Sequence, residues 1–457
     1  MNTIRGSFRA AVLLAAAASV LALAGGAKAQ NSSATNNTWP YAKTHRSPVL
    51  AVVGDIACQP DADAPPSCTE SAHENCTTPK SPYISTSLWQ SQEATANQIE
   101  NIIKPDAVAL LGDLQYQVGQ YQDFEQSFDL TYGAFKFLTR PSPGNHEFYD
   151  EHNATGVAGY GYFSYYNGFQ VNSSGQPITV QLGDPCPEAL SAACNYPGLT
   201  TSDPQPVPRS DGQAGHFEQT GGVEGTIPSG GTVGVADGWY SYNLGSWHLI
   251  SLNIECSTQP GGCSFSPGTW LAAETEWLKN DLEQNHSACT AAYWHQPTYS
   301  AADSLTPEGI TAGTWWQLLY DAGADLVLNG HDHLYARYAP IRPYFDASDT
   351  SVTGVTGTWL GTPDPNRGIR EFIVGTGGET LDTVVSAPTS PTDWDGQFNQ
   401  QFLEAATGNY WGVMALTLGE HGYQWDYESA LEAPVAPAGT PASYSDKGSA
   451  TCHGGHN

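Results

Sequence analysis

Short apolar runs of strand character alternate with helical segments from Ser47 onward, and this alternation constrains the fold more than any other feature of the chain. Strands joined through helices pair in parallel, which produces an α/β fold with buried sheets. In such folds ligands collect at the carboxyl ends of the strands. The runs that we predict as strands are 49–53, 107–111, 248–254, 290–294, 325–328 and 371–374.

Helices and a hairpin are predicted between and after these strands. The segment 87–106 suits a helix that ends before Pro105. Its apolar positions are Leu88, Ile99, Ile102 and Ile103. A second helix is predicted around 274–285, and residues 408–429 alternate in the manner of a two-stranded hairpin.

Polar residues that can bind metal ions follow five of the strand-like segments. Each motif alone is weak, because a Gly-Asp after a strand is usually a turn and a His-x-His pair is often a surface feature. At one edge of a sheet, however, these groups together would form a ligand set for two metal ions, with a carboxylate able to bridge them. The groups are Asp55, Asp113 with Tyr116, Asn145 with His146 and Glu147, His295, and His331 with His333.

The blocks GDIA, GDLQY, GNHE, a lone histidine and GHDH resemble, in this order, the five blocks of the calcineurin-like metallophosphoesterases. The GDxxY form of the second block resembles the purple acid phosphatase branch, and the sequence similarity extends over most of residues 47–430. The resemblance implies a two-sheet β-sandwich flanked by helices, the αββα form of the α/β class. It implies one metal ion held by Asp55, Asp113, Tyr116 and His333, and a second held by Asp113, Asn145, His295 and His331.

The resemblance implies hydrolysis of phosphate monoesters by attack of a metal-bound hydroxide, with Asp113 bridging the ions and His146 reaching the substrate phosphate. Two alternatives stay open. The same site could act on phosphodiesters or nucleotides. A non-catalytic secreted metal-binding or interaction protein could keep the fold, although it would have little reason to keep every ligand.

Tyr116 bears on the identity of the metals. A phenol with a reference pKa near 10 is a poor ligand for a weak cation, but a hard trivalent ion can remove its proton. This favours Fe(III) beside Tyr116, with Zn, Fe(II) or Mn in the second position. The alternative is that Tyr116 only packs beneath the site.

The residue that protonates the leaving group is left open. Plant members of the branch carry further histidines just after the fourth block, whereas residues 296–309 have none. His146 is the first candidate, followed by His152 and Tyr299. His216 is either a substrate contact or a surface residue.

The N-terminus predicts export. Arg5 and Arg9 precede an apolar run at 10–24 and an Ala-Lys-Ala site that ends at Ala29, which is typical of a signal peptide at 1–29. A membrane anchor is the alternative, but the apolar run is short for a membrane span. We therefore expect a secreted protein, extracellular or periplasmic.

The formal net charge is −30, and cleavage after Ala29 removes three cations and no acid, which gives −33. Such a surface repels nucleic acid and anionic membranes, so neither is an expected partner of the mature chain. A pair of metal ions would supply the local positive potential that a phosphate ester substrate needs. The oligomeric state does not follow from the sequence.

Nine cysteines in an exported chain favour disulfides, because no spacing among them suits a zinc site. Short separations suggest Cys186–Cys194 and Cys256–Cys263. Cys289 is the candidate partner of Cys452. Two of the three remaining cysteines would pair and one would stay free; they are Cys58, Cys68 and Cys76.

The chain divides into a signal peptide, a flexible leader at 30–46, a catalytic domain at 47–432, and a linker with a tail at 433–457. The domain contains an insertion at 150–235 that is rich in Gly, Pro and Ser. An insertion of this length is either disordered or a functional segment that disulfides hold in place, and we expect it to shape the entrance of the substrate site.

Overall fold

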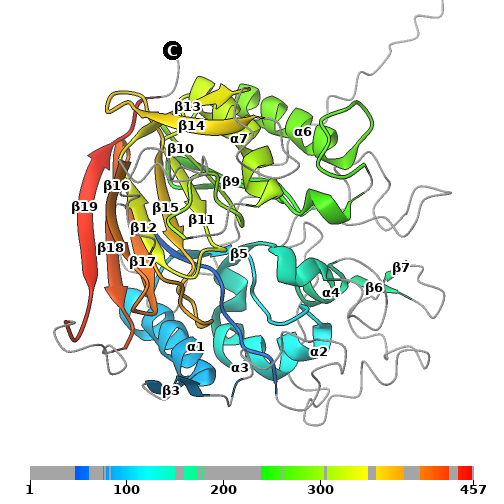
Figure 1. Ribbon diagram of the computed structural model, residues 1–457, viewed down its shortest axis with the longest axis vertical. Helices are drawn as coiled ribbons and strands as arrows, with labels where there is room; N and C mark the ends of the chain where they lie inside the picture. The colour runs from blue at the N-terminus through cyan, green and yellow to red at the C-terminus, as the bar shows by residue number, and fades with distance from the viewer. Residues whose placement is uncertain are drawn as a thin grey trace, which may run out of the picture. The chain divides into compact units, whose positions relative to one another are not determined.

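Two large β-sheets contain most of the described strands in the computed structural model (Figure 1). The residues that it describes belong to the unit Thr38–Asn457. They are 47–60, 76, 79–81, 84–149, 159–167, 169–171, 177–179, 238–259, 261–302, 306–347, 357–384, 402–431 and 441–454.

Some predictions lie outside the described residues. They are the signal peptide, the leader, most of the insertion and of the linker, His152, His216, Cys68, Cys186 and Cys194. Within the described part, no helix combines the length and the apolar character that crossing a membrane requires.

The first sheet joins strands from the N-terminal and C-terminal parts of the described chain. Its strands β1, β4 and β5 are parallel, and β17, β18 and β19 extend the sheet in antiparallel fashion from β1. In spatial order the strands are β19 (Ser445–Thr451), β18 (Gly422–Ser429), β17 (Gly412–Leu418), β1 (Val49–Val53), β4 (Ala107–Leu111) and β5 (Thr139–Ser142).

The second sheet has a parallel centre of β9, β10, β11 and β15, with antiparallel strands on both sides. In spatial order its strands are β16 (Leu403–Thr407), β12 (Tyr335–Tyr338), β15 (Arg370–Val374), β11 (Leu326–Asn329), β10 (Cys289–Trp294), β9 (Trp247–Ser251) and β8 (Tyr240–Leu244).

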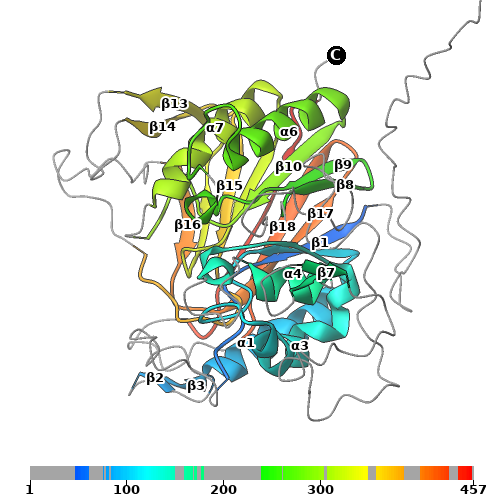
Figure 2. The same ribbon diagram turned by 90° about the vertical axis from the view of Figure 1, so that its right-hand side faces the viewer.

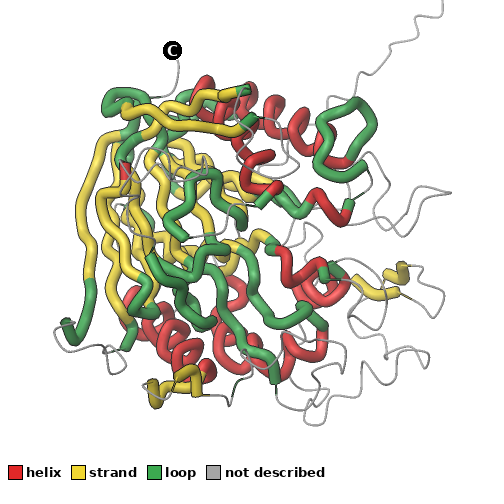
Figure 3. Tube along the Cα trace, viewed as in Figure 1, coloured by secondary structure: helices red, strands yellow, loops and turns green. Residues whose placement is uncertain are grey.

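The core consists of three layers because strand side chains alternate between the two faces of a sheet. Leu50 and Val52 of β1 belong to the cluster between the sheets, whereas Ala51 and Val53 pack against helices. Figures 1 and 2 show the helices outside the sheets, and Figure 3 shows the same separation by colour. This is the two-sheet sandwich flanked by helices that the sequence resemblance implied.

The first sheet is covered by helical segments from the first half of the chain, and the second sheet by α6 and α7. The described segments on the first sheet are α1 (Leu88–Asn97), η1 (Gln98–Ile103), α2 (Tyr121–Asp123), η2 (Phe124–Phe128), α3 (Asp129–Thr131), η3 (Tyr132–Leu138) and α4 (Tyr160–Asn167). Those on the second are α6 (Trp270–Gln284) and α7 (Pro307–Asp321).

Side chains at the helix starts explain where α6 and α7 begin. The Thr269 hydroxyl accepts from the Ala272 N–H at 3.3 Å, and the Thr306 hydroxyl accepts from the Gly309 N–H at 3.0 Å. Each satisfies a donor that the first helical turn leaves unpaired. Pro307 then occupies the first turn of α7, where its missing N–H costs nothing.

The predicted helix before Pro105 forms as α1 followed by the π-helical turns of η1. Leu88 and Ile99 are buried as expected, but Ile102 is 64% exposed. The wider π-helical turn rotates residues relative to a regular α-helix. The helix forms where it was predicted, and Ile102 lies on its exposed side.

The remaining described elements form three small hairpins and two short helical turns. The strand β13 (Ile341–Asp346) pairs with β14 (Thr358–Pro363) beside α7. The other elements are β2 (Pro79–Ser81) with β3 (Ile84–Ser87), β6 (Phe169–Val171) with β7 (Pro177–Thr179), η4 (Asn145–Phe148) and η7 (Cys256–Thr258). The part of the predicted insertion that forms α4 packs against the first sheet, since Tyr162 and Tyr165 are buried in the core.

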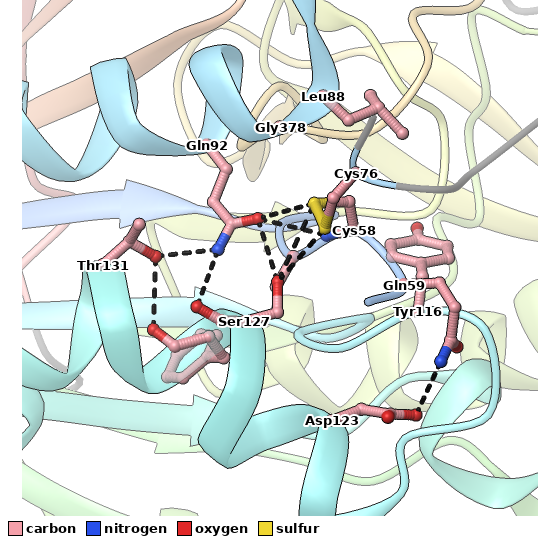
Figure 4. Close-up of a disulfide and its surroundings, with 12 residues drawn as sticks. Cys58, Gln59, Cys76, Leu88, Gln92, Tyr116, Asp123, Ser127, Thr131 and Gly378 are labelled. Atoms are coloured by element: carbon pink, nitrogen blue, oxygen red, sulfur yellow. Dashed lines mark hydrogen bonds between the residues drawn. A yellow bond between two sulfur atoms is a disulfide. The ribbon is translucent and has the colours of Figure 1, made fainter. Parts of the chain in front are cut away.

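Three disulfides are formed by described cysteines, and two of them match the predicted pairs: Cys256–Cys263 and Cys289–Cys452. The third, Cys58–Cys76, fits the prediction that two of the three N-terminal cysteines pair. It holds the loop after β1 against the helices (Figure 4), where the Gln92 amide accepts from the Cys58 N–H at 3.1 Å and donates to the Thr131 hydroxyl at 2.8 Å.

Candidate metal centre

The carboxyl ends of both sheets meet at one place. Asp55 and Asp113 follow the parallel strands β1 and β4, and Asn145 follows β5. His295 follows β10, and His331 with His333 follows β11, both in the second sheet. The expectation of a single sheet edge was therefore wrong, because strands buried on both faces give no sign in the sequence of the sheet that they join.

Hydrogen bonds across the sheets fix this junction. The ring of His295 lies with its Nδ1 2.8 Å from the Leu111 carbonyl oxygen at the end of β4. The Gly54 N–H donates to the Val374 carbonyl of β15 at 2.8 Å. Residues from opposite sheets are thus held at hydrogen-bonding distance around the same point.

Four side chains form the first donor group around the Tyr116 hydroxyl, which is fully buried. Its oxygen lies 3.1 Å from Asp55 Oδ1, 3.2 Å from Asp113 Oδ2 and 2.9 Å from His333 Nε2. His333 Nε2 also lies 3.3 Å from Asp55 Oδ1. Tyr116 therefore lies among the predicted ligands of the first ion.

The second donor group surrounds His295. Its Nε2 lies 3.0 Å from Asp113 Oδ2, 3.1 Å from Asn145 Oδ1 and 3.3 Å from His331 Nδ1. The Asp113 carboxylate contacts both groups, which is the position that a bridging ligand needs. The structure thus brings together all seven side chains that the sequence predicted as ligands.

Partners outside the centre orient these donors. His333 Nδ1 lies 2.6 Å from the Thr380 carbonyl oxygen, and His295 Nδ1 faces a carbonyl in the same way. Since a carbonyl accepts only, each Nδ1 is the donor in its pair, and each Nε2 is directed to the centre, where it would act as the ligand atom once an ion displaces its proton. Asn145 donates through Nδ2 to the Tyr149 hydroxyl at 2.7 Å, which orients Oδ1 toward His295 Nε2 at the centre.

Three of the predicted ligands adopt left-handed backbone conformations. The φ angles are 61° at Asp55, 49° at Asp113 and 68° at His331. Non-glycine residues rarely have positive φ, and they keep it where the surroundings fix the chain. The strand-end loops therefore turn their side chains inward at a cost in backbone strain, which is typical of functional sites.

Glycines beside the ligands leave the space that other ligands fill. A Cβ on Gly144 would lie 2.3 Å from Asp113 Oδ1, and one on Gly112 would lie 2.5 Å from His295 Nδ1. Gly112 also has a φ of 87°. The glycines of the GD and GNHE blocks are thus required by close approach as well as by backbone conformation.

Glu147 holds two of the strand-end loops together, a role that we did not predict from the sequence. Its carboxylate accepts from the N–H groups of Asp113 at 3.0 Å and Gly144 at 2.7 Å. It also accepts from Leu114 at 2.8 Å and Gln115 at 3.1 Å. The position of Glu147 at the end of the GNHE block was the sequence feature from which this role could have been predicted.

The charges of the centre favour a cation. Although burial acts in the opposite direction, the carboxylate of Asp113 raises the pKa of His295 to about 10, and Asp55 likewise raises the pKa of His333 to about 10. Burial and the neighbouring His295 lower the pKa of His331 to about 3. Positive charge is thus favoured beside the carboxylates, and a bound metal ion would supply it.

The donor set fits metal ions. Ligand atoms of Asp113, His295 and His331 lie within 4.8 Å of one another. Carboxylate, phenol and amide oxygens with imidazole nitrogens suit iron, zinc and manganese. A second cluster of Cys289, Asp325 and Cys452 does not fit, because its two cysteines form a disulfide.

The candidate proton donors lie in different environments. His146 borders the centre: its N–H donates to Asp113 Oδ1 at 2.9 Å, and its Nδ1 lies 2.6 Å from the Gln117 carbonyl oxygen. Its Nε2 is 3.8 Å from Asp113 Oδ2. Tyr299 instead packs against Trp316 in the core and donates to the Leu360 carbonyl at 3.2 Å, so the structure does not place it at the centre.

A cavity of about 220 Å³ adjoins the second donor group. Its lining includes Glu255 and Glu308, which we did not single out from the sequence. Glu255 follows β9, so the strand-end reasoning that found Asp55 could also have found it. The lining residues are Asn145, Tyr149, Glu255, Ser257, Thr258, Gln296, Thr306, Glu308 and His331.

Comparison with known proteins finds relatives in which the matched segment covers only part of each chain. An uncharacterised protein of Mycobacterium tuberculosis is 31% identical over 152 residues, 32% of this chain and 28% of that protein. Purple acid phosphatase 15 of Arabidopsis thaliana is 32% identical over 103 residues, 22% of this chain and 18% of that enzyme. The matched segments thus span less than a third of these relatives.

A purple acid phosphatase from yellow lupin seeds has a TM-score of 0.43 at 16% identity, with 87% of this chain and 53% of that chain covered. The profile of the calcineurin-like phosphoesterases matches residues 49–335, a range that contains every predicted ligand from Asp55 to His333. The family is metal-dependent, usually with two ions. The chain belongs to the calcineurin-like phosphoesterases.

Proposed function

We propose that the protein is a secreted phosphatase that hydrolyses phosphate monoesters with the help of two metal ions. The observation that carries this proposal is the Asp113 carboxylate, which lies 3.2 Å from the Tyr116 hydroxyl of one donor group and 3.0 Å from His295 Nε2 of the other. A carboxylate in contact with two donor groups can bridge two cations.

The proposed ligands of the first ion are Asp55, Asp113, Tyr116 and His333. Those of the second are Asp113, Asn145, His295 and His331. The phenol of Tyr116 favours Fe(III) in the first position, and Zn, Fe(II) or Mn would occupy the second. We assign the catalytic region to 47–432.

The bound ions would activate water and neutralise the charge on the phosphoryl oxygens. The side chains of this chain orient the reactants. His146 keeps its Nδ1 on the Gln117 carbonyl, so its Nε2 is directed to the centre, where a substrate phosphate would lie. Asn145 and Tyr149 form a hydrogen-bonded pair at the mouth of the cavity.

Secretion is supported by disulfides that tie separate parts of the structure together, because such bonds persist in oxidising compartments. The signal peptide predicted at 1–29 is consistent with the same destination.

The test is turnover of p-nitrophenyl phosphate and of its bis ester by the metal-loaded protein. We expect the monoester to be preferred. Asp113→Asn should lower kcat/KM by more than about 100-fold, since even outer partners of metal ligands contribute about 10–100-fold. Asp321→Asn, a change outside both donor groups, is the matched control and should retain activity.

Preference for the bis ester would replace the monoesterase assignment with a phosphodiesterase. Near-normal turnover by Asp113→Asn with both metals still bound would refute the bridging role. Absence of turnover in the metal-loaded protein at every pH would favour a non-catalytic metal-binding protein.

A further inference from the structure

The segment 375–382 reads Gly-Thr-Gly-Gly-Glu-Thr-Leu-Asp and follows the strand β15. Because β15 is parallel to β11, the segment begins at the sheet edge that carries His331. It lies beyond residue 335, where the match to the family profile ends, and none of the proposed ligands belongs to it. Its contacts show instead that it holds ligands supplied by other segments.

The glycines of this segment bring its backbone against the first ligand block. The Gly377 N–H donates to the Gly54 carbonyl at 2.9 Å, and the Glu379 N–H donates to the Asp55 carbonyl at 3.1 Å. A Cβ on Gly377 would lie 2.5 Å from the Gly54 carbonyl oxygen, and one on Gly375 would lie 2.7 Å from Asp55 Oδ2. Only glycine allows this close approach, so the segment packs directly against the backbone that carries Asp55.

The segment is also bonded to the first sheet. The Thr376 hydroxyl donates to the Gly412 carbonyl of β17 at 2.8 Å, and the Gly412 N–H donates to the Thr376 carbonyl at 3.1 Å. The indole N–H of Trp411 donates to the Glu379 carbonyl at 2.6 Å. Since β15 belongs to the second sheet and β17 to the first, the segment is fixed from both sides of the junction at which the ligands meet.

The end of the segment holds His333 through its backbone and its ring. The His333 N–H donates to Asp382 Oδ2 at 2.8 Å, and the Asp382 N–H donates to the His333 carbonyl at 2.8 Å. The ring is oriented by the Thr380 carbonyl oxygen, 2.6 Å from Nδ1. With the backbone and the ring fixed in this way, Nε2 lies 2.9 Å from the Tyr116 hydroxyl in the first donor group.

We propose that residues 375–382 form a positioning element for the first donor group, in which the Asp382 carboxylate accepts from the His333 backbone and so keeps the imidazole within reach of the first ion. The inference rests on the proposed ligands of that ion and adds a residue that acts through His333. A carboxylate close to a cation site could also act through its charge alone. Position and charge make different predictions for substitutions at Asp382.

The experiment compares three substitutions at one position. Asp382→Asn removes the charge but keeps an oxygen that can accept from the His333 N–H. Asp382→Glu keeps the charge but moves the carboxylate by one methylene, and Asp382→Ala removes both. Asp364→Ala is the matched control, because this loop carboxylate precedes β15 and also accepts from backbone N–H groups, those of Asn366 at 3.2 Å and Arg367 at 3.1 Å.

The affinity of the full chain for Fe(III) is measured by competition with a chelator, together with the visible absorption band. We expect Asp382→Ala and Asp382→Glu to lower this affinity by at least about tenfold, because outer partners of metal ligands contribute about 10–100-fold. Both should also shift the band, since His333 and Tyr116 are proposed ligands of one ion. Asp382→Asn and Asp364→Ala should keep the affinity and the band of the wild type.

Urea unfolding of the metal-free variants shows whether each one folds. Asp382 is only half-buried, so its substitution by a polar residue of similar size should leave the fold intact. If Asp382→Ala does not fold, the comparison of Asp382→Asn with Asp382→Glu decides between position and charge.

Affinity that is lost in Asp382→Asn and kept in Asp382→Glu would overturn the proposal, because the charge would then be what matters. Affinity that all three variants keep would overturn it as well. If the wild type binds iron and hydrolyses p-nitrophenyl phosphate in either case, the proposed function stands and only the positioning role is lost. If the wild type binds no metal ion, the proposed function fails, and the positioning role fails with it.

Discussion

Tyr116 lies where a ligand would bind the first ion, and its hydroxyl contacts two carboxylates and an imidazole. We predict that Tyr116→Phe abolishes the visible absorption of the iron-loaded protein, because the charge-transfer band requires a phenolate bound to Fe(III). The visible spectrum and the iron content check this. Tyr299→Phe is the matched control, since that buried hydroxyl bonds to a backbone carbonyl in the core. An unchanged band in Tyr116→Phe would show that Tyr116 only packs beneath the site.

At this scale the types of the site residues could be predicted from the sequence, because polar residues after buried strands are few and stand in recognisable blocks. The backbone conformation of these residues could not be predicted from the sequence. Nothing in the letters Asp55, Asp113 and His331 indicates a left-handed φ. The tertiary contacts that stabilise it come from residues far apart in the chain, such as the approach of Gly144 to Asp113.

Among the structural elements, the turns after β4 and β5 are held together by the carboxylate of Glu147, which accepts hydrogen bonds from both. We predict that Glu147→Gln lowers the free energy of unfolding by about 2–3 kcal/mol, because the amide nitrogen would face backbone N–H groups that need an acceptor. Loosening of Asp113 should also weaken metal binding. Urea denaturation and metal titration measure the two effects, with the exposed Glu276→Gln as control. Unchanged unfolding and metal affinity would contradict this role.

Strand positions were predicted to within one residue for β1, β4 and β10, because their apolar runs are buried on both faces. The prediction of 248–254 extended too far past β9, since Leu252 and Ile254 remain buried after the ladder ends at Ser251. The strand β19, within the predicted tail, was missed. Its residues are polar and mostly exposed, so they lack the periodic apolar signal.

For the whole molecule, one disulfide connects the two sheets. Cys289 begins β10 in the second sheet and Cys452 follows β19 in the first, at a separation of 163 residues. The chain-entropy model gives about 5 kcal/mol for a loop of this length and about 2 kcal/mol for a loop like that of Cys256–Cys263, which spans 7 residues.

We therefore predict that replacing Cys289 and Cys452 by Ser destabilises the protein more than the same change at Cys256 and Cys263. The free energy of unfolding in urea, measured for both double variants, checks the order. The reverse order would mean that strain or residual structure in the unfolded chain outweighs loop entropy.

The strand β19 also bears on how the protein behaves in concentrated solution. It is the outermost strand of the first sheet, it bears Lys447, and it covers the backbone groups of β18. Without it, β18 would present unpaired N–H and C=O groups, with Trp425 and Tyr427 beside them, to other molecules. We predict that a chain ending at Leu431 self-associates in light scattering, whereas the full-length Cys289→Ser, Cys452→Ser variant stays monodisperse. If both variants self-associate, the disulfide is what prevents aggregation, and if neither does, β18 needs no cover. If only the truncated chain self-associates, a strand far in sequence from every proposed ligand keeps the protein in solution.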